Sequence, residues 1–394
     1  MQGDSSEEGV ADNMNFALPE EILEFKENVK SFAKSVILPS AEERDLNGTW
    51  DPILWKKMGE MGLLGLSIPE EYGGQGASCL MTTVAHEAFA EGSCDGGLTL
   101  ALGAHAIIGT MPIVFCGTEA QKRKYLPKLA TGEYTSGLGL TEPGSGSDAA
   151  GSMETRAVKK GEKYVLNGTK MFITNGPIGD VFIVMAVTDK SKGAMGISVF
   201  IVEKGFKGFK VGKKLNKMGM RTSLTSELIF EDMEVPEENR LEKENSGFVR
   251  IGRATLEWER TVLVAASIGS MQNMIDNGVL YAKQRKQFGE PLIKFQAIQE
   301  KIARSRMKLD AARLLIYKSA TKKDQGLPAP IESSIAKVYA TEAAAEVAYD
   351  MGQIHGGYAF IHEFPIERAY RDMRLGTIGA GTSEVMRSII AANT

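Results

Sequence analysis

Apolar residues recur at helical spacing through the first third of the chain. In segment 20–37 they stand at Ile22, Phe25, Val29, Phe32, Ala33 and Val36, close to the period of one helix face. Similar spacing predicts helices over Asp51–Leu63, Ser78–Glu91, Gly96–Phe115 and Glu119–Ala130, and Pro39 is expected to end the first helix. The N-terminal third is therefore expected to be all helical.

The pattern becomes β-prone between Glu133 and about Val235. The run KYVLNGTKMFITNG predicts two strands joined at Asn167–Gly168, because Asn-Gly is the strongest short-range hairpin signal. DVFIVMAV, GISVFIVE and SELIFEDMEV continue as strands separated by glycine, lysine and aspartate. Many short strands without helices between them predict an antiparallel sandwich or barrel.

Helical spacing returns after Phe248. Thr255–Gln284 and Gln296–Lys323 are long enough to pack as a bundle, and Ile331–Gly352 is rich in alanine. We therefore expect a multidomain α+β protein in three units. They are a helical unit over 1–135 (with 1–15 as a disordered tail), an antiparallel β unit over 136–245 and a helical bundle over 246–394.

Composition and charge exclude several classes of protein. Hydrophobic residues make up 43% and charged residues 24% of the chain, which is typical of globular proteins. The net charge is -4 without a long basic run, and no run of 18 uninterrupted apolar residues occurs, so neither nucleic-acid binding nor membrane insertion is expected. The three cysteines and four histidines lack metal-ligand spacing, so no metal is expected. The acidic N-terminus is unlike a signal or transit peptide, which favours the cytoplasm.

Two segments of the β-prone region have the composition of a ligand site. Gly139–Gly151 reads GLTEPGSGSDAAG, in which glycines free the backbone to approach a ligand and Thr141, Ser145 and Ser147 supply hydroxyls. In MFITNG, Phe172 and Thr174 share one strand face and could lie against a flat ring and hydrogen-bond its edge. Each segment alone also fits an ordinary surface loop or strand end.

Two features of the C-terminal region add to these. Gln353–Glu384 contains two glycine clusters around a charged helical stretch, and an interior helical glycine costs about 1 kcal/mol relative to alanine. Glu259 shares an apolar helix stripe with Val262, Leu263 and Ala266, where desolvation is expected to raise its pKa as a general base near neutral pH requires. A structural ion pair of Glu259 with an arginine is the alternative.

Together these blocks resemble the acyl-CoA dehydrogenase family over almost the whole chain. GLTEPGSGSD is similar to the family's first signature, and QIHGGYAFIHEFPIERAYRDMRL followed by GTSE is similar to its second. FITN, the helix that carries ER, and RKQFGEPLIKFQ lie between them in the same order. The resemblance implies an N-terminal all-α domain, a middle antiparallel β domain and a C-terminal four-helix domain, with FAD as cofactor and a thioester of coenzyme A as substrate.

The resemblance also implies roles for individual residues. The backbone and hydroxyls of 138–147 would hold the flavin ring, Phe172 would pack on it, and Thr174 would hydrogen-bond near N5. The adenine and pyrophosphate would be bound by two subunits: Arg285, Phe288 and Gln296 of one, and residues 353–357 of another. Such sharing implies a homo-oligomer, usually a tetramer. The full cofactor-binding set is Leu138, Leu140, Thr141, Gly146, Ser147, Phe172, Ile173, Thr174, Arg285, Phe288, Gln296, Gln353, Gly356, Gly357, Thr382 and Glu384.

This chain departs from the commonest family pattern at the catalytic base. Most members carry a glutamate immediately before the Gly-Thr of the second signature, where this chain has Ala380. In a minority branch, which includes isovaleryl-CoA and long-chain dehydrogenases, the glutamate lies on the long helix just before an arginine, as Glu259 does before Arg260. Glu259 is therefore the expected base, and the expected substrate-binding residues are Ser147, Glu257, Arg260, Gly379, Ala380 and Gly381.

The resemblance finally implies a reaction. Glu259 would remove a proton from Cα of a short or branched acyl-CoA while a hydride passes from Cβ to flavin N5, and the N–H of Ala380 would donate to the thioester oxygen. IGAGTSEV and LGAH are similar to the isovaleryl-CoA branch, and Gly379 replaces a bulky tyrosine of many straight-chain enzymes, so isovaleryl-CoA is the first expectation.

Electrons would pass on to an electron-transfer flavoprotein, in fatty acid or branched-chain amino acid catabolism. Two alternatives stay open at this point. The chain could be a flavoprotein of the same fold that reduces an enoyl-CoA, or a non-catalytic homologue that binds acyl-CoA. A mature mitochondrial matrix protein is the less favoured alternative to a bacterial cytoplasmic one.

Overall fold

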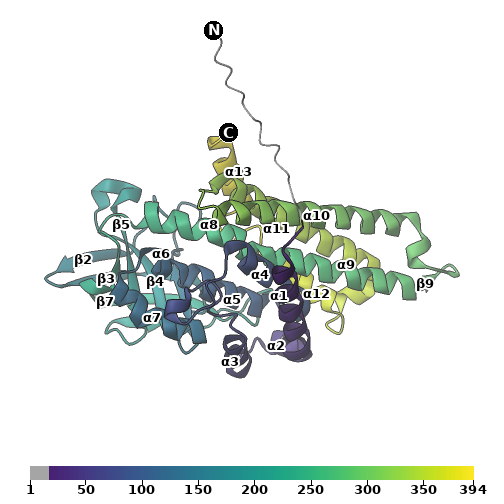
Figure 1. Ribbon diagram of the computed structural model, residues 1–394, viewed down its shortest axis with the longest axis horizontal. Helices are drawn as coiled ribbons and strands as arrows, with labels where there is room; N and C mark the ends of the chain where they lie inside the picture. The colour runs from purple at the N-terminus through teal and green to yellow at the C-terminus, as the bar shows by residue number, and fades with distance from the viewer. Residues whose placement is uncertain (1–16) are drawn as a thin grey trace, which may run out of the picture.

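The computed structural model describes residues 17–394, apart from the side chains of 249, 253 and 254, and the chain forms helices, then a sheet, then helices (Figure 1). The helices before the sheet are α1 (Glu20–Phe32), α2 (Ala41–Asn47), α3 (Pro52–Glu60), α4 (Cys79–Ser93), α5 (Gly96–Gly103), α6 (Met111–Cys116) and α7 (Glu119–Thr131). The helices after it are α8 (Arg253–Thr261), α9 (Ala266–Gln284), α10 (Gln296–Asp324), α11 (Pro330–His355), α12 (Pro365–Met373) and α13 (Ser383–Ala392). The predicted fold class is confirmed, whereas the limits of the three units stay a prediction and the expected tail 1–15 lies outside the described residues.

Four of the described N-terminal helices, α3, α4, α5 and α7, begin at residues whose side chains cap them. The Ser78 hydroxyl accepts from the Met81 N–H at the start of α4, and Thr118 and Gln121 form a reciprocal capping box at the start of α7. The first helix changes geometry before the expected end at Pro39, because α1 passes into a π-helical turn over Ala33–Ile37 and a 3-10 turn over Leu38–Ser40. Proline lacks the N–H that a continuous α-helix needs at this point.

The segment Gly96–Cys116 contains the most apolar described helix. It is long and apolar enough to cross a membrane, with a mean hydropathy of 1.8, but 78% of its most apolar window is buried inside the protein, as in a core helix. A π-helical turn over Ala104–Gly109 separates α5 from α6, and the Thr110 hydroxyl donates to the His105 carbonyl at 2.7 Å. His105 also accepts from the Ser136 N–H at 3.1 Å, which joins this helix to the start of the sheet.

The sheet contains the strands β1 (Ser136–Gly139), β2 (Arg156–Lys160), β3 (Lys163–Thr174), β4 (Val181–Val187), β5 (Ile197–Glu203), β6 (Phe209–Val211), β7 (Thr225–Pro236) and β8 (Arg240–Leu241). Their order is β6-β7-β3-β2-β4-β5-β8, with β1 on β4. Most neighbours are antiparallel, as predicted, but β1 pairs with β4 in parallel, and β2 meets β4 in parallel at one residue pair. Alternate side chains of β4 enter different clusters: Val181 and Ile183 pack in the cluster of Tyr125 from α7, and Phe182 and Val184 in that of Phe230 from β7.

The predicted hairpin at Asn167–Gly168 is wrong. These residues lie in the middle of β3, at a register shift against β7, while the turn between β2 and β3 is at Gly161. The Asn167 side chain accepts from the Asp232 N–H at 2.8 Å and donates to the Asp232 carboxylate at 3.0 Å, which stabilises the bulge. A Cβ at Gly168 would lie 2.4 Å from the Thr155 hydroxyl, so close strand packing also requires glycine here.

The C-terminal helices form the elongated half of the molecule. The predicted helix Thr255–Gln284 is divided, because α8 ends at Thr261 and a 3-10 turn over Leu263–Ala265 precedes α9. Helices α9, α10 and α11 then run together to the end of the molecule opposite the sheet, where the small hairpin of β9 (Lys286–Gln287) and β10 (Glu290–Pro291) lies (Figure 1). The break at Val262 separates the predicted catalytic helix from the bundle that supports it.

Gly269 on α9 sets how closely α9 approaches α4. A Cβ at this position would lie 2.0 Å from the Glu87 carbonyl oxygen. Gly269→Ala should lower the free energy of unfolding by about 1–3 kcal/mol, since overpacking outweighs the gain of about 1 kcal/mol in helix propensity. Gly352→Ala on α11 is the matched control, because its nearest neighbour is 3.7 Å away and the propensity gain should be kept. Equal urea midpoints for the two variants would contradict this account.

Candidate active site

The glycine-serine loop that follows β1 is held in place by a buried ion pair. The Lys170 ammonium on β3 lies 2.7 Å from the Glu142 carboxylate, both side chains are buried, and Lys170 also donates to the Leu140 carbonyl at 3.1 Å. Glu142 further accepts from the N–H groups of Glu154 and Thr155. Burial lowers the pKa of Lys170 to about 8, against the opposing effect of Glu142. Burial alone would raise the pKa of Glu142, but Lys170 and these donors hold it below its usual value.

Above this ion pair the loop is open on its outer side. Gly144 and Gly146 have no atom within 4 Å of the place where a Cβ would lie, and Ser147 is exposed. The loop is joined to the end of β3 because the Met171 N–H donates to the Thr141 carbonyl at 2.8 Å. The structure therefore places the predicted residues 138–147 directly beside MFITNG.

The end of β3 presents an aromatic ring outward. A register shift between Lys170 and Ile173 places Phe172 in the left-handed region, with φ of 60°, and leaves its side chain 62% exposed. Ile173 is buried and Thr174 half-buried, so the two predicted ring-contacting residues alternate with a core residue. A non-glycine residue in this conformation is strained, and such strain is concentrated at functional sites.

Glu259 lies on α8 between Glu257 and Arg260, two residues that have protein partners of their own. Within the described chain, its carboxylate has no hydrogen-bond or ion-pair partner, and the residue is partly exposed. Desolvation by the surrounding protein raises the pKa of Glu259 to about 7, although the positive charges of Arg260 and Lys337 oppose this effect. The predicted base is thus unpaired, and the alternative of a structural ion pair does not describe it.

Glu257, predicted to contact substrate, lies on a different side of the same helix. Residues two apart on a helix point roughly 200° apart. The Glu257 carboxylate is 2.7 Å from the Lys323 ammonium and accepts from the Ala329 N–H at 3.2 Å, at the junction of α10 and α11. Glu257 therefore anchors α8 to the bundle, and its substrate contact stays a prediction.

The segment 376–382 approaches α8 from the other side. The Arg260 guanidinium donates to the Ala380 carbonyl at 3.0 Å, and the Lys337 ammonium donates to the Gly381 carbonyl at 2.6 Å. Ala380 and Gly381 both adopt positive φ, of 58° and 93°. Among the described residues no acceptor takes the N–H groups of Ala380 or Gly381, so these donors are available to a ligand. Thr382 caps α13 through the Val385 N–H, and the exposed Glu384 follows in its first turn.

The remaining predicted residues gather at the far end of the bundle. Arg285, Gly356 and Gly357 line one cavity, and the Arg285 guanidinium lies 6.0 Å from the centre of the Tyr358 ring. Phe288 stands at the tip of the β9–β10 turn, 94% exposed and with φ of 51°. Gln296 and Gln353 are also exposed, at the first turn of α10 and the last turn of α11. One chain thus brings together two segments that the sequence analysis assigned to different subunits.

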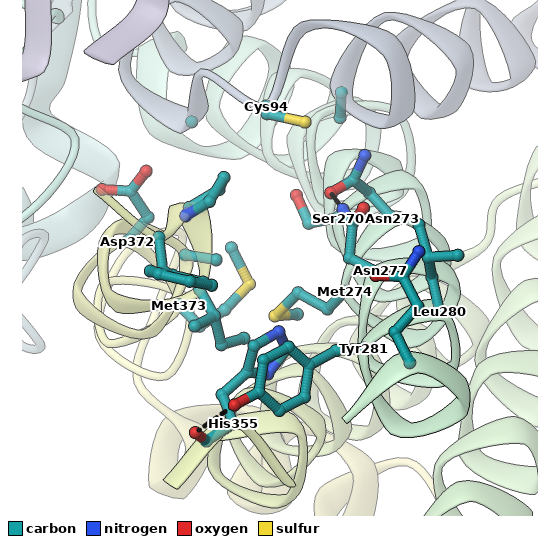
Figure 2. A pocket seen from close by; sticks show the side chains of 17 residues that line it. Cys94, Ser270, Asn273, Met274, Asn277, Leu280, Tyr281, His355, Asp372 and Met373 are labelled. Atoms are coloured by element: carbon teal, nitrogen blue, oxygen red, sulfur yellow. Dashed lines mark hydrogen bonds between the residues drawn. The ribbon is translucent and has the colours of Figure 1, made fainter. Parts of the chain in front are cut away.

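These two groups of predicted cofactor residues lie at opposite ends of the chain. The first belongs to the sheet and the second to the β9–β10 end of the bundle (Figure 1). A neighbouring cavity of about 210 Å³ between α9 and α12 contains none of the predicted site residues (Figure 2). Tyr281 and His355, stacked with ring centres 4.5 Å apart, form the wall between this cavity and that of Arg285.

Sequence reasoning missed three residues that build the site. Lys170 and Glu142 were passed over because an alternating strand pattern does not reveal which polar residue is buried. Lys337 was not predicted because the surrounding alanine-rich sequence indicates only a helix. The available signal was its position on a stripe of small residues, with Ser333, Ser334 and Thr341 three or four residues away, where a solvated lysine is not expected.

Family models and relatives match nearly the whole chain. The acyl-CoA dehydrogenase N-terminal domain matches residues 19–133, the middle domain 137–233 and the C-terminal domain 245–394. An acyl-CoA dehydrogenase of Bacillus subtilis is 44% identical over 92% of this chain and 95% of its own. A mitochondrial isovaleryl-CoA dehydrogenase of Arabidopsis thaliana is 44% identical over 93% and 90%, and a 3-(aryl)acrylate reductase of Clostridium sporogenes is 43% identical over 92% and 96%.

Solved structures agree with this match. Butyryl-CoA dehydrogenase from Megasphaera elsdenii superposes with a TM-score of 0.93 at 40% identity, over 96% of this chain and 99% of its own. A structure described as electron transferring flavoprotein of Acidaminococcus fermentans gives 0.93 at 43% identity, and the FAD complex of PigA gives 0.94 at 32%, both with the same coverage. FAD is therefore the cofactor. The open loop at Gly144 and Gly146 and the outward ring of Phe172 beside it fit the flat ring system of this cofactor.

The first prediction concerns the buried ion pair of Lys170 and Glu142, which holds the glycine-serine loop after β1. Lys170→Met should destabilise the protein by about 3–5 kcal/mol, because Glu142 stays buried without its counter-charge, and the purified variant should carry less FAD. Lys163→Met on the same strand is the control, since its pair with Glu234 is exposed and should contribute under about 1 kcal/mol. Similar unfolding midpoints and FAD content in both variants would show that the ion pair does not support the loop.

The raised pKa of Glu259 makes the second prediction. A carboxyl that holds its proton more tightly in the folded state contributes stability that is present below the unfolded pKa of about 4.3 and is lost as the pH rises through about 7. Glu259→Gln should therefore gain stability relative to the parent as the pH rises from 4 to 8, by at most about 4 kcal/mol. Thermal unfolding against pH measures the effect, with Glu60→Gln, at an exposed position, as control. A pH-independent difference would contradict the desolvation of Glu259.

Proposed function

The chain belongs to the acyl-CoA dehydrogenase family, whose members are FAD-dependent oxidoreductases that act on CH–CH bonds. We propose that this protein dehydrogenates a short or branched acyl-CoA, with Glu259 as the base. One arrangement carries the proposal. An unpartnered carboxylate with a pKa of about 7 lies on α8 next to Arg260, and Arg260 binds a segment whose Ala380 N–H has no acceptor among the described residues. A proton acceptor and an oxyanion donor are the two groups that removal of a proton beside a thioester requires.

Glu259 acts on the proton at Cα. At pH 7 to 8 much of the carboxyl is ionised, yet it is far more basic than an exposed glutamate, because desolvation disfavours its charged form. Arg260 and Lys337 keep the pKa from rising further. When bound, FAD takes up the hydride that leaves Cβ.

The segment around Ala380 stabilises the charge that develops on the thioester oxygen. Its N–H is a backbone group, so it remains a donor whatever side chain residue 380 carries. This explains how the base can lie on α8 while the usual glutamate position holds alanine. Arg260 binds the Ala380 carbonyl and so holds this peptide segment against α8. Ser147, at the open loop, is the proposed contact to the CoA portion.

Gly379 supports a branched acyl chain. The three atoms nearest to a Cβ at this position belong to Leu375 and lie 3.8–3.9 Å away, so the backbone beside Ala380 is not crowded. The isovaleryl-CoA dehydrogenase of Arabidopsis thaliana at 44% identity supports the same choice, whereas the Megasphaera elsdenii structure is a butyryl-CoA dehydrogenase. Since one methylene is discriminated by about 1–3 kcal/mol, isovaleryl-CoA is proposed as the preferred substrate rather than the only one.

A complete cofactor site is proposed to need more than one copy of the chain. The residues for the flavin ring and those for the adenine and pyrophosphate lie at opposite ends of one chain (Figure 1). A homo-oligomer, with a tetramer as the proposed state, brings the two ends of different copies together. An electron-transfer flavoprotein is the proposed electron acceptor, which the Acidaminococcus fermentans structure supports, and the bacterial relatives support a cytoplasmic location.

Enoyl-CoA reduction is the second candidate function. It is favoured by the 3-(aryl)acrylate reductase of Clostridium sporogenes at 43% identity. A carboxyl with a pKa of about 7 is present in both protonation states near neutral pH, so Glu259 can also return a proton to Cα. A non-catalytic homologue is disfavoured, because a desolvated, unpaired glutamate serves no evident structural purpose.

The test is anaerobic reduction of the bound flavin by a panel of acyl-CoA thioesters. Isovaleryl-CoA should bleach the parent fastest, and Glu259→Gln should bind acyl-CoA yet reduce the flavin at least about 1,000-fold more slowly. With limiting substrate, the rate should rise with pH around a midpoint near 7, because the base must be ionised.

Glu60→Gln is the control, since it removes an exposed carboxylate outside the candidate site and leaves the Glu257 anchor of α8 intact. Near-normal bleaching of Glu259→Gln would refute the assignment. Faster reoxidation of reduced enzyme by enoyl-CoA than reduction by any acyl-CoA would instead favour the reductase.

A further inference from the structure

Lys337 on α11 is completely buried, although lysine is almost never fully buried unless it is paired. Its ammonium donates to the Gly381 carbonyl at 2.6 Å, and in the part of the chain that the structure describes no carboxylate lies within ion-pairing distance of it. Burial lowers its pKa to about 8. An unpaired ammonium in this position is a net cost to folding, so its presence calls for a functional reason.

The backbone that Lys337 holds is itself strained. Ala380 and Gly381 are consecutive residues with positive φ, and alanine has no intrinsic preference for this region. Two cations hold the two carbonyls, Arg260 that of Ala380 and Lys337 that of Gly381. Charge-assisted hydrogen bonds of this kind are stronger than neutral ones. The direction of the free Ala380 N–H therefore depends on both anchors.

The charge of Lys337 also acts on the base. Glu259 is flanked by Arg260 on its own helix and by Lys337 on α11, and both favour its ionised form. Lys337 in turn interacts with Arg260, Glu259, Glu342 on its own helix and Glu384 on α13. Separately, the hydrogen bond from Lys337 to the Gly381 carbonyl joins α11 to the segment that carries the proposed oxyanion donor.

We propose that Lys337 is a positioning residue of the active site, which fixes the Gly381 carbonyl so that the Ala380 N–H meets the thioester oxygen and places a positive charge beside Glu259. The proposal rests on the dehydrogenation proposed above. It assigns to one buried lysine both the geometry of the oxyanion donor and the ionisation of the base. It also explains why a lysine lies on a buried face of α11 that otherwise contains the small residues Ser333, Ser334 and Thr341.

Three variants separate these roles in the FAD-bound protein. Lys337→Arg keeps a charged donor, Lys337→Gln keeps a donor without charge, and Lys337→Met keeps neither. Lys322→Met is the matched control, because it removes a half-buried lysine that pairs with Glu332 at the α10–α11 junction. If Lys337→Met does not accumulate as folded protein, the arginine and glutamine variants still decide the question.

Two readouts are measured on each variant. The first is the rate of flavin reduction at saturating acyl-CoA. The second is the pKa of Glu259, measured without substrate as the pH midpoint of its infrared carboxyl band. That band is identified as the one that is missing in Glu259→Gln. The second readout needs no turnover, so it tests the role of Lys337 even if no acyl-CoA reduces the flavin. Failure of every acyl-CoA to reduce the flavin would contradict the proposed function, not the role of Lys337.

Lys337→Met should reduce the flavin about 10-fold more slowly or worse, approaching the roughly 100-fold loss of an oxyanion donor itself. The Glu259 midpoint should rise by about one unit in the methionine and glutamine variants and stay unchanged in Lys337→Arg and Lys322→Met. The glutamine variant should keep more of its rate than the methionine variant. A parental rate and midpoint in Lys337→Met, or an arginine variant as impaired as methionine, would overturn the proposal.

Discussion

The proposed active site depends on a carboxylate that is desolvated and, in the described part of the chain, unpaired. Glu259 loses water to the surrounding protein and has no hydrogen-bond partner among residues 17–394. Burial raises its pKa to about 7, and the charges of Arg260 and Lys337 oppose a further rise. Stronger pairing would make it too weak a base, and the absence of both cations would keep it protonated. The rest of the site follows from this balance, because the same two cations also hold the backbone at Ala380 and Gly381.

The protein supports this balance with rigid elements from all three parts of the chain. Glu257 ties α8 to the α10–α11 junction, so that Glu259 is left facing the other way. Lys170 and Glu142 hold the cofactor loop against β3, and His105 joins the apolar helix to the start of β1. The two groups of predicted cofactor residues lie at opposite ends of the chain, and this separation is the physical basis for proposing an oligomer.

Much of the fold could be predicted from the sequence, because helices with a clear apolar stripe and capping residues are specified locally. The helices at Ser78–Glu91, Glu119–Ala130 and Gln296–Lys323 match α4, α7 and α10 within a few residues. The prediction of a hairpin at Asn167–Gly168 was wrong because it rests on a local turn signal. The contacts of Asn167 with Asp232 and of Gly168 with Thr155, which keep these residues inside a strand, involve residues distant in the sequence. The division of the long helix at Val262 was likewise invisible, since no proline or glycine marks it.

The candidate site shows the same limit. Glu259 could be singled out as a candidate base, because a carboxylate on an apolar stripe is a local pattern and the resemblance to a family accounts for the alanine at position 380. Its catalytic role stays a prediction. Lys337, Lys170 and Glu142 could not, because their importance depends on which residues they meet in three dimensions. The approach of Arg285 to Gly356 and Gly357 within one chain was equally a matter of tertiary packing.

The most direct measurement is a crystal structure of the FAD-loaded Glu259→Gln variant with isovaleryl-CoA bound. The account predicts that the carboxamide of residue 259 lies within about 4 Å of Cα and that the Ala380 nitrogen lies about 3 Å from the thioester oxygen. A carboxamide turned toward solvent, with another side chain against Cα, would contradict it.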